Sequence, residues 1–301
     1  QAVLGEGTVR SLADLGITGA SQGGHGIHIQ GGTISNQNLI AGGNAGASNA
    51  DEPGASGGIG VIGTNLVIIN RGTIRGGLNG NGTTRALSVL LLGGSNSLQL
   101  GAMTDEPARF EGGIHLAGGM LAIGGEGNQT LVDPLRGNGA LRVVTNLRTT
   151  AMHGFSGTVD IASGSTLQLD GSFVGASLLT VESGATLAGS GNAGYTLVKS
   201  GGFIAPGPGV STLRILGDLT MEEGSTYRVK VTPQTQTGDY LKVSGKATLA
   251  GTALHVGPES AFDVATTHTI LSASEIVGGF TTVKSDYAYL TASLTQVEND
   301  I

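Results

Sequence analysis

The chain of 301 residues has no cysteine and no tryptophan. The lack of cysteine excludes disulfides, zinc sites built on thiolates and a cysteine nucleophile. Aromatic residues account for 4% and charged residues for 12% of the sequence, where about 25% charged is usual. A chain with so few large side chains must stack many narrow layers, because it cannot build one thick core. Exported bacterial surface proteins often lack thiols, so the composition favours that class.

Further absences concern membranes and nucleic acids. No basic segment followed by an apolar run opens the chain as a signal peptide does, and no apolar run approaches the roughly 18 residues of a membrane helix. We therefore expect a signal and an anchor outside this chain. The net charge is -7 and the 15 basic residues are scattered, so no nucleic-acid partner is expected.

Glycine is what the chain has in abundance, with 55 residues. The glycines lack the period of collagen and apolar residues still make up 39%, which excludes both a triple helix and a disordered tail. Short segments between glycines alternate apolar and polar residues, as in 159–161 and 167–170. Alternation with a period of two places the aliphatic side chains on one face of a β-strand. Glycine and asparagine between strands supply the positive φ values of corners.

Internal repeats indicate a solenoid. Short motifs recur at spacings near twenty residues or its multiples, allowing for loop insertions. They match 164–167 with 184–187 and 224–227, 32–34 with 72–74, and 26–34 with 113–121. One coil could not bury its inner face alone, whereas coils stacked at about 4.8 Å create a continuous core. We predict an all-β fold, a right-handed parallel β-helix.

A block near the C-terminus carries the strongest resemblance to known proteins. Its elements occur in the order Ile204–Gly207, Gly217–Thr220, Gly224–Tyr227, Asp239–Gly251, Phe280–Val283 and Tyr289–Thr291. This series, over about 202–295, resembles the end of the passenger domain of bacterial autotransporters (type V secretion). In that family the last rungs of a β-helical stem form the autochaperone region, which closes the solenoid.

The resemblance implies a division of the chain. Residues 1–211 would form the β-helical stem, and residues 212–301 a C-terminal cap continuous with it. The cap would emerge first at the cell surface and template the folding of the stem. It also implies export through the periplasm and outer membrane, and one partner outside this chain, the protein's own outer-membrane β-barrel translocator. A host-surface or extracellular-matrix ligand, or self-association, is the other expected partner.

Two segments receive more specific predictions. The glycine-rich stretch 41–58 has almost nothing to bury, so we expect a protruding or loosely wound loop, interpreted either as a disordered insertion or as a binding loop. At the other end, enlarged aromatic residues are expected to close the last rung, whose strand edges would otherwise be unpaired. These aromatic residues are Tyr227, Phe262, Phe280, Tyr287 and Tyr289. Tyr227 is further expected to occupy the position of Leu167 and Leu187 in earlier coils.

Several motifs imitate catalytic or nucleotide-binding sites. GxSxG occurs around Ser21 and Ser56, but neither serine is followed by a helical pattern, which the nucleophile elbow requires. GxGxxG occurs at 58–63 and 189–194, and both lead into strands, so no helix N-terminus receives a phosphate. We interpret these glycines as corners and predict no catalytic residue and no cofactor-binding residue.

Histidines and acidic pairs suggest a metal site, which we also reject. His25 and His28 are three apart, and along a strand their rings would point to opposite faces. His28 and His115 occupy matching places between aliphatics, so both are expected to face solvent. The acidic pairs lie in predicted turns at 51–52, 105–106 and 222–223. No metal site is predicted.

Two functions from different classes follow. The first is a non-enzymatic, surface-exposed passenger segment of adhesin or virulence type, whose C-terminal rungs template folding and assist secretion. The alternative is the stem of an exported autotransporter protease or lipase, with its catalytic domain upstream of this chain. A glycan-cleaving β-helix is disfavoured because tryptophan is absent and the carboxylates are dispersed.

Overall fold

The computed structural model describes residues 22–46, 55–102, 106–232, 237–257, 266–287 and 291–301. Within these ranges every regular element is a β-strand, and pairings between named strands are parallel except in the hairpin of β24 and β25. The prediction of an all-β fold is therefore confirmed, and the stacked parallel ladders agree with a parallel β-helix. The chain divides into two compact units, the first with 1–142 and 154–156, the second with 143–153 and 157–301.

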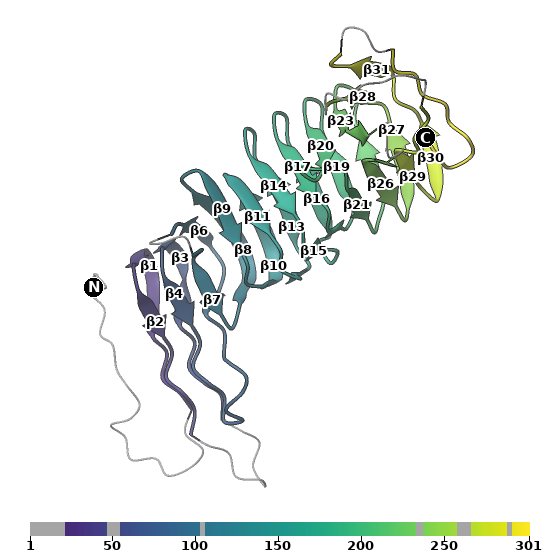
Figure 1. The fold of residues 1–301 in the computed structure, drawn as a ribbon. Helices are drawn as coiled ribbons and strands as arrows, with labels where there is room; N and C mark the ends of the chain where they lie inside the picture. Colours follow the sequence, from purple (N-terminus) through teal and green to yellow (C-terminus); the bar gives the residue numbers. More distant parts are fainter. Residues whose placement is uncertain (1–21, 47–54, 103–105, 233–236, 258–265, 288–290) are drawn as a thin grey trace. The chain divides into compact units, whose positions relative to one another are not determined.

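The first unit stacks long and short strands. Its strands are β1 (Ile27–Asn36), β2 (Leu39–Ala41), β3 (Val61–Asn70), β4 (Thr73–Arg75), β5 (Val89–Leu91), β6 (Ser95–Leu100), β7 (Arg109–Glu111), β8 (Ile114–Gly125), β9 (Asn128–Leu131), β10 (Leu135–Val143) and β12 (Gly154–Phe155). One ladder runs from β1 to β3, then through β5 and β6 to β8, and a second joins β2, β4 and β7 (Figure 1). Buried aliphatic residues such as Leu66 and Ile68 point into the unit from these strands.

The register of this unit differs from the predicted repeats. Ile74 lies beside Ile40, whereas Ile34 lies beside Ile68, so the match of 32–34 with 72–74 was wrong. The coil here runs from Ile34 to its partner Ile68, which makes it much longer than the predicted repeat. The match of 26–34 with 113–121 holds only in its first half, because the stretch that follows in β8 is longer than its counterpart in β1.

Glycine-rich segments that precede β1 and β3 and follow β2 and β4 form an ordered backbone stack, which we call the glycine stack. It consists of residues 22–26, 42–46, 55–60 and 76–80. The N–H of Gly43 donates to the carbonyl of Gly24, that of Gly58 to Gly43, and that of Gly77 to Gly58, each at 2.8 Å. A Cβ on Gly58 would lie 1.9 Å from the Gly24 carbonyl oxygen, so only glycine permits this approach.

The glycine stack changes the interpretation of the predicted loop at 41–58. Its described ends, 42–46 and 55–58, are not loosely wound, because backbone hydrogen bonds hold them to neighbouring coils. Residues 47–54 lie outside the described residues. Composition suggested a loop because glycine offers no side chain to bury, but here the absence of side chains is what lets the backbones approach.

The second unit has three ladders of short strands. Its strands are β11 (Asn146–Thr149), β13 (Thr158–Ile161), β14 (Thr166–Leu169), β15 (Ser172–Phe173), β16 (Leu178–Val181), β17 (Thr186–Gly189), β18 (Asn192–Ala193), β19 (Thr196–Val198), β20 (Phe203–Pro206), β21 (Thr212–Ile215), β22 (Leu219–Met221), β23 (Thr226–Val229), β24 (Val231–Thr232), β25 (Thr237–Gly238), β26 (Tyr240–Val243), β27 (Lys246–Leu249), β28 (Thr252–His255), β29 (Leu271–Ser272), β30 (Glu275–Gly278) and β31 (Thr282–Ser285). The ladders run β13-β16-β19-β22-β27-β30, β11-β14-β17-β20-β23-β28-β31 and β15-β18-β21-β26-β29 (Figure 1).

Side-chain facing in this unit follows the predicted parity. Val159 and Ile161 are fully buried while Asp160 between them is only partly buried, and Leu167 and Leu169 are buried in the same way. The inner column runs through Leu167, Leu187 and Ile204 to Tyr227, as register pairing shows. This confirms that Tyr227 occupies the position of the two leucines.

Corners of the second unit depend on glycine. Gly164, Gly184 and Gly224 begin the three matching motifs and have φ of 76°, 75° and 82°, a region that L side chains rarely adopt. Leu167 pairs with Leu187, so the first two coils have the spacing that the motif predicted. The next coil places Gly201, with φ of 77°, at the same corner, although the motif does not recur there. The connection from β17 to β20 is shorter than the one before it, so this coil departs from the predicted spacing.

The last coils close differently from the expectation. Tyr227 is a fully buried core residue, so it does not itself cover the end of the solenoid. Phe280 and Tyr287 are partly buried on the final coils. Phe262 and Tyr289 lie outside the described residues. The chain end itself covers a strand edge, since the N–H of Ile301 donates to the carbonyl of Leu271 at 2.9 Å in an antiparallel sense. The ladders cross residue 211 without interruption, so the functional division there stays a prediction.

Candidate functional site

The histidines near the N-terminus lie closer together than predicted. The rings of His25 and His28 have centroids 6.3 Å apart and pack edge to face, so the prediction that they diverge was wrong. His25 precedes β1 and therefore does not follow strand alternation, and its Nδ1 accepts the N–H of Ile59 at 3.0 Å. His28 and His115 do share one column, through Ile62 and Leu90, as predicted. Within the described ranges no three His, Asp or Glu side chains gather as a metal site would require.

The described GxSxG and GxGxxG motifs and the described acidic pair lie at corners and turns, as expected. Ser56 is exposed in the glycine stack and is followed by β3, not by a helix, and Ser21 lies outside the described residues. The GxGxxG stretches at 58–63 and 189–194 lead into β3 and β19. Glu222 and Glu223 are exposed, and Glu222 accepts the backbone N–H of Ser200 at 3.1 Å. Residues 51, 52 and 105 of the other acidic pairs are outside the described residues.

A buried histidine in the second unit has a structural role. The ring of His153 stacks on Phe173 with centroids 4.1 Å apart and planes 13° apart. Its Nε2 lies 2.8 Å from Oγ1 of Thr149, which is fully buried. Burial lowers the pKa of His153 to about 4, so the ring is neutral at physiological pH. A neutral, buried ring stacked on Phe173 serves the packing of the core.

An ion pair in the predicted autochaperone region holds three segments together. Asp239 is fully buried, accepts the backbone N–H groups of Ser211 and Lys230 at 3.0 and 2.9 Å, and lies 2.6 Å from the Lys230 ammonium. The same ammonium donates to the carbonyl of Pro206 at 2.6 Å. Burial raises the pKa of Asp239, and its bonds to Lys230 and Ser211 oppose that rise. These contacts tie β20, β21 and β23 together.

Tyr227 links successive coils of the same region. Its phenol donates to the carbonyl of Ile270 at 2.8 Å, and its ring lies 6.1 Å from that of Phe280. Burial raises the pKa of Tyr227 well above its ordinary value, so the phenol stays protonated and remains a donor. The next coil places Ala253 beside it, and this small residue leaves room for the ring.

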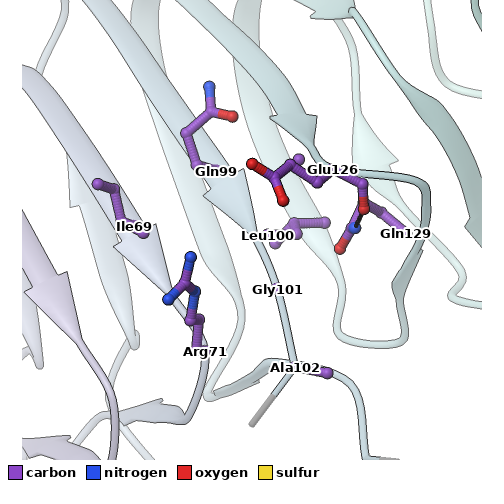
Figure 2. A pocket seen from close by; sticks show the side chains of 9 residues that line it. Ile69, Arg71, Gln99, Leu100, Gly101, Ala102, Glu126 and Gln129 are labelled. Atoms are coloured by element: carbon purple, nitrogen blue, oxygen red, sulfur yellow. Dashed lines mark hydrogen bonds between the residues drawn. The ribbon is translucent and has the colours of Figure 1, made fainter.

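An open depression of about 340 Å³ lies on the first unit, where three strands end (Figure 2). Asn70, Leu100 and Gly125 end β3, β6 and β8 and pair in one column, so Arg71, Gly101 and Glu126 follow them on successive coils. Figure 2 shows Arg71 on one side of Gly101, with Glu126 and Gln129 on the other. The lining residues are Ile69, Arg71, Gln99, Leu100, Gly101, Ala102, Gly125, Glu126 and Gln129.

Sequence reasoning missed this depression. Its members come from three successive coils, so they are far apart along the chain, and none belongs to a catalytic motif. No signal within one coil could have found it, because the register that places glycine between two long polar side chains is set by the tertiary structure. Within the described residues, the chain has no helix that could span a membrane.

Comparisons with known proteins place the chain near an extracellular protein. No family model matches it. It is 29% identical over 147 residues, 45% of this chain, to a protein named "Extracellular serine protease" from Serratia marcescens. The match covers 14% of that protease, so the chain spans a small part of the relative's length. The likeness is consistent with an exported, autotransporter-related segment.

Proposed function

We propose that this chain is a non-enzymatic passenger segment of an autotransporter, exposed at the bacterial surface, whose C-terminal coils template the folding of those upstream. The observation that carries the proposal is the set of contacts that join successive coils in the C-terminal part of the second unit. Tyr227 bonds to a coil further along the chain, and Lys230 with Asp239 clamps neighbouring strands. The likeness to an extracellular protease and the parallel fold support export.

The template role follows from the physics of a solenoid. A coil offers its upstream neighbour a row of backbone donors and acceptors and an apolar inner face, and each added coil recreates that edge. The first coil to form has no such edge, so it must be stabilised by contacts of its own. The buried phenol and the buried ion pair are contacts of this kind, because they hold the last coils together without any strand of the first unit.

Folding order in the full chain tests the proposal. Pulse-labelling hydrogen exchange during refolding should show protection of β22–β30 before protection of β1–β8. Tyr227→Ala should then slow protection of both units, because it disrupts the template. The matched control is Phe155→Ala, another fully buried aromatic residue, outside the C-terminal coils; it should destabilise the chain yet leave early protection of β22–β30 unchanged. Earlier protection of β1–β8, or equal slowing by both variants, contradicts the template role.

A second candidate function is favoured by the name of the relative. The chain would then be the stem of an exported protease or lipase whose catalytic domain lies upstream of Gln1. A fluorophosphonate probe applied to the product of the whole reading frame distinguishes the two. Labelling of a serine outside residues 1–301 supports this alternative, and labelling of Ser56 contradicts both candidates. No labelling supports the non-enzymatic passenger.

A further inference from the structure

We propose that the depression around Gly101 binds an acidic saccharide, a ligand with one anionic group and several hydroxyls. This goes beyond the proposed function, since neither export nor templated folding requires it. Its volume of about 340 Å³ lies within the roughly 300–1,000 Å³ typical of small-molecule sites. The proposal rests on how coil register distributes donors, acceptors and apolar surface around one glycine.

The cationic side of the depression is Arg71. Among the described residues its guanidinium forms no hydrogen bond or ion pair, and its aliphatic stem lies over Gly101. A Cβ at Gly101 would come 2.9 Å from Cγ of Arg71. Glycine therefore permits the stem to lie against the backbone, with the guanidinium at the rim (Figure 2). A guanidinium that forms no internal ion pair is suited to a carboxylate or sulfate, which it can bind through two parallel hydrogen bonds.

The middle coil and the side opposite Arg71 supply acceptors. On the middle coil Nε2 of Gln99 donates to Oγ of Ser97 at 2.8 Å, and on the opposite side Nε2 of Gln129 donates to the carbonyl of Glu126. Each bond uses one of the two N–H groups of the amide, so the second N–H stays available as a donor and the amide oxygen as an acceptor. The exposed carboxylate of Glu126 adds a further acceptor on this side. A ligand hydroxyl can donate a hydrogen bond both to a neutral amide oxygen and to the anionic carboxylate of Glu126.

The floor and the spacing complete the match. Ile69 and Ala102 contribute apolar surface, against which the C–H face of a sugar ring can lie. Arg71 and Glu126 are two coils apart, which at about 4.8 Å a coil separates their backbones by roughly 10 Å. A ligand that reaches both sides must therefore be longer than a simple anion. A short saccharide with one acidic ring meets these requirements.

Titration calorimetry on the refolded full chain tests the site. The probes are an oligoglucuronate, a sulfated oligosaccharide, a neutral glucose oligomer and inorganic sulfate. Saturable binding of the two acidic oligosaccharides, weaker at high salt, is expected, because the charge interaction is screened. The glucose oligomer should bind more weakly and inorganic sulfate weakest. Preference for one acidic oligosaccharide identifies the anion as carboxylate or sulfate.

Three variants locate the binding. Arg71→Gln should weaken acidic oligosaccharides by about tenfold or more and leave the neutral oligomer unchanged, because a charged hydrogen bond is lost. Glu126→Ala should weaken both kinds by about threefold, because it removes an acceptor of hydroxyls. Gly101→Ala should weaken acidic oligosaccharides by displacing Arg71, and its φ carries no steric conflict with a side chain.

The same unit offers a matched control. Gly154 also lies beneath an arginine, Arg136, whose Cγ would be 3.5 Å from an added Cβ, and neither lines the depression. Arg136→Gln and Gly154→Ala should leave binding unchanged. Equal effects of Arg71→Gln and Arg136→Gln overturn the proposal, since binding would then be diffuse charge attraction. Absence of saturable binding by either acidic oligosaccharide, or tighter binding of inorganic sulfate than of both, also overturns it.

Discussion

The buried histidine makes the stability of the second unit depend on pH in a predictable direction. Its folded-state pKa of about 4 is below the ordinary 6.5, so between these values the unfolded chain binds a proton that the folded chain does not. The contribution of His153 is therefore fully present above pH 6.5 and is lost as pH falls toward 4. At about 1.36 kcal/mol per pH unit, this loss amounts to about 3 kcal/mol.

A variant isolates this contribution from those of other titrating groups. His153→Phe keeps an aromatic ring against Phe173 but cannot be protonated. Urea unfolding followed by circular dichroism at intervals from pH 7.5 to 4 should show the wild type losing about 3 kcal/mol relative to the variant. Asp239 titrates in both chains, and because its folded pKa is raised it acts in the opposite direction, so the difference between the curves cancels it.

A second measurement checks the pKa itself. NMR titration of the His153 ring gives an independent value of its pKa. Parallel curves for wild type and His153→Phe, or a measured pKa for His153 near 6.5, would refute the reasoning.

Three further changes have expected results. Tyr227→Phe should reduce the free energy of unfolding by about 1–2 kcal/mol in urea titrations, because a buried carbonyl loses its donor; no change would contradict that role for the phenol. Gly58→Ala should abolish slow hydrogen exchange in the glycine stack, while Gly24→Ala, where an added Cβ meets open space, should not; equal exchange in both refutes the steric argument. Lys230→Met should cost about 3–5 kcal/mol at pH 7, because the Asp239 carboxylate is left buried without its cation. That cost should shrink in acid as the carboxyl group, whose pKa is raised, takes up a proton, and a cost independent of pH would argue against a buried charge.

Much of the second unit could be predicted because its rules are local. Alternation assigns Val159 and Ile161 to the core, and the recurring motif places Gly164 and Gly184 at equivalent corners. The first two coils of the first unit follow a longer repeat, which the sequence contains. Residues 23–46 align with residues 57–80, with identical Gly-Gly pairs. The aligned Asn36 and Asn70 share a buried side-chain hydrogen bond of 2.8 Å in the structure.

The sequence by itself determined the strand type, the facing of side chains and the corners, because these depend on residues within one coil. Only the tertiary structure decided which coils lie in register, since that depends on the length of every connection between them. The register brings Gly24 against Gly58, which turns a stretch without side chains into an ordered stack. It also sets Arg71 and Glu126 on either side of Gly101, a site that no stretch of neighbouring residues contains.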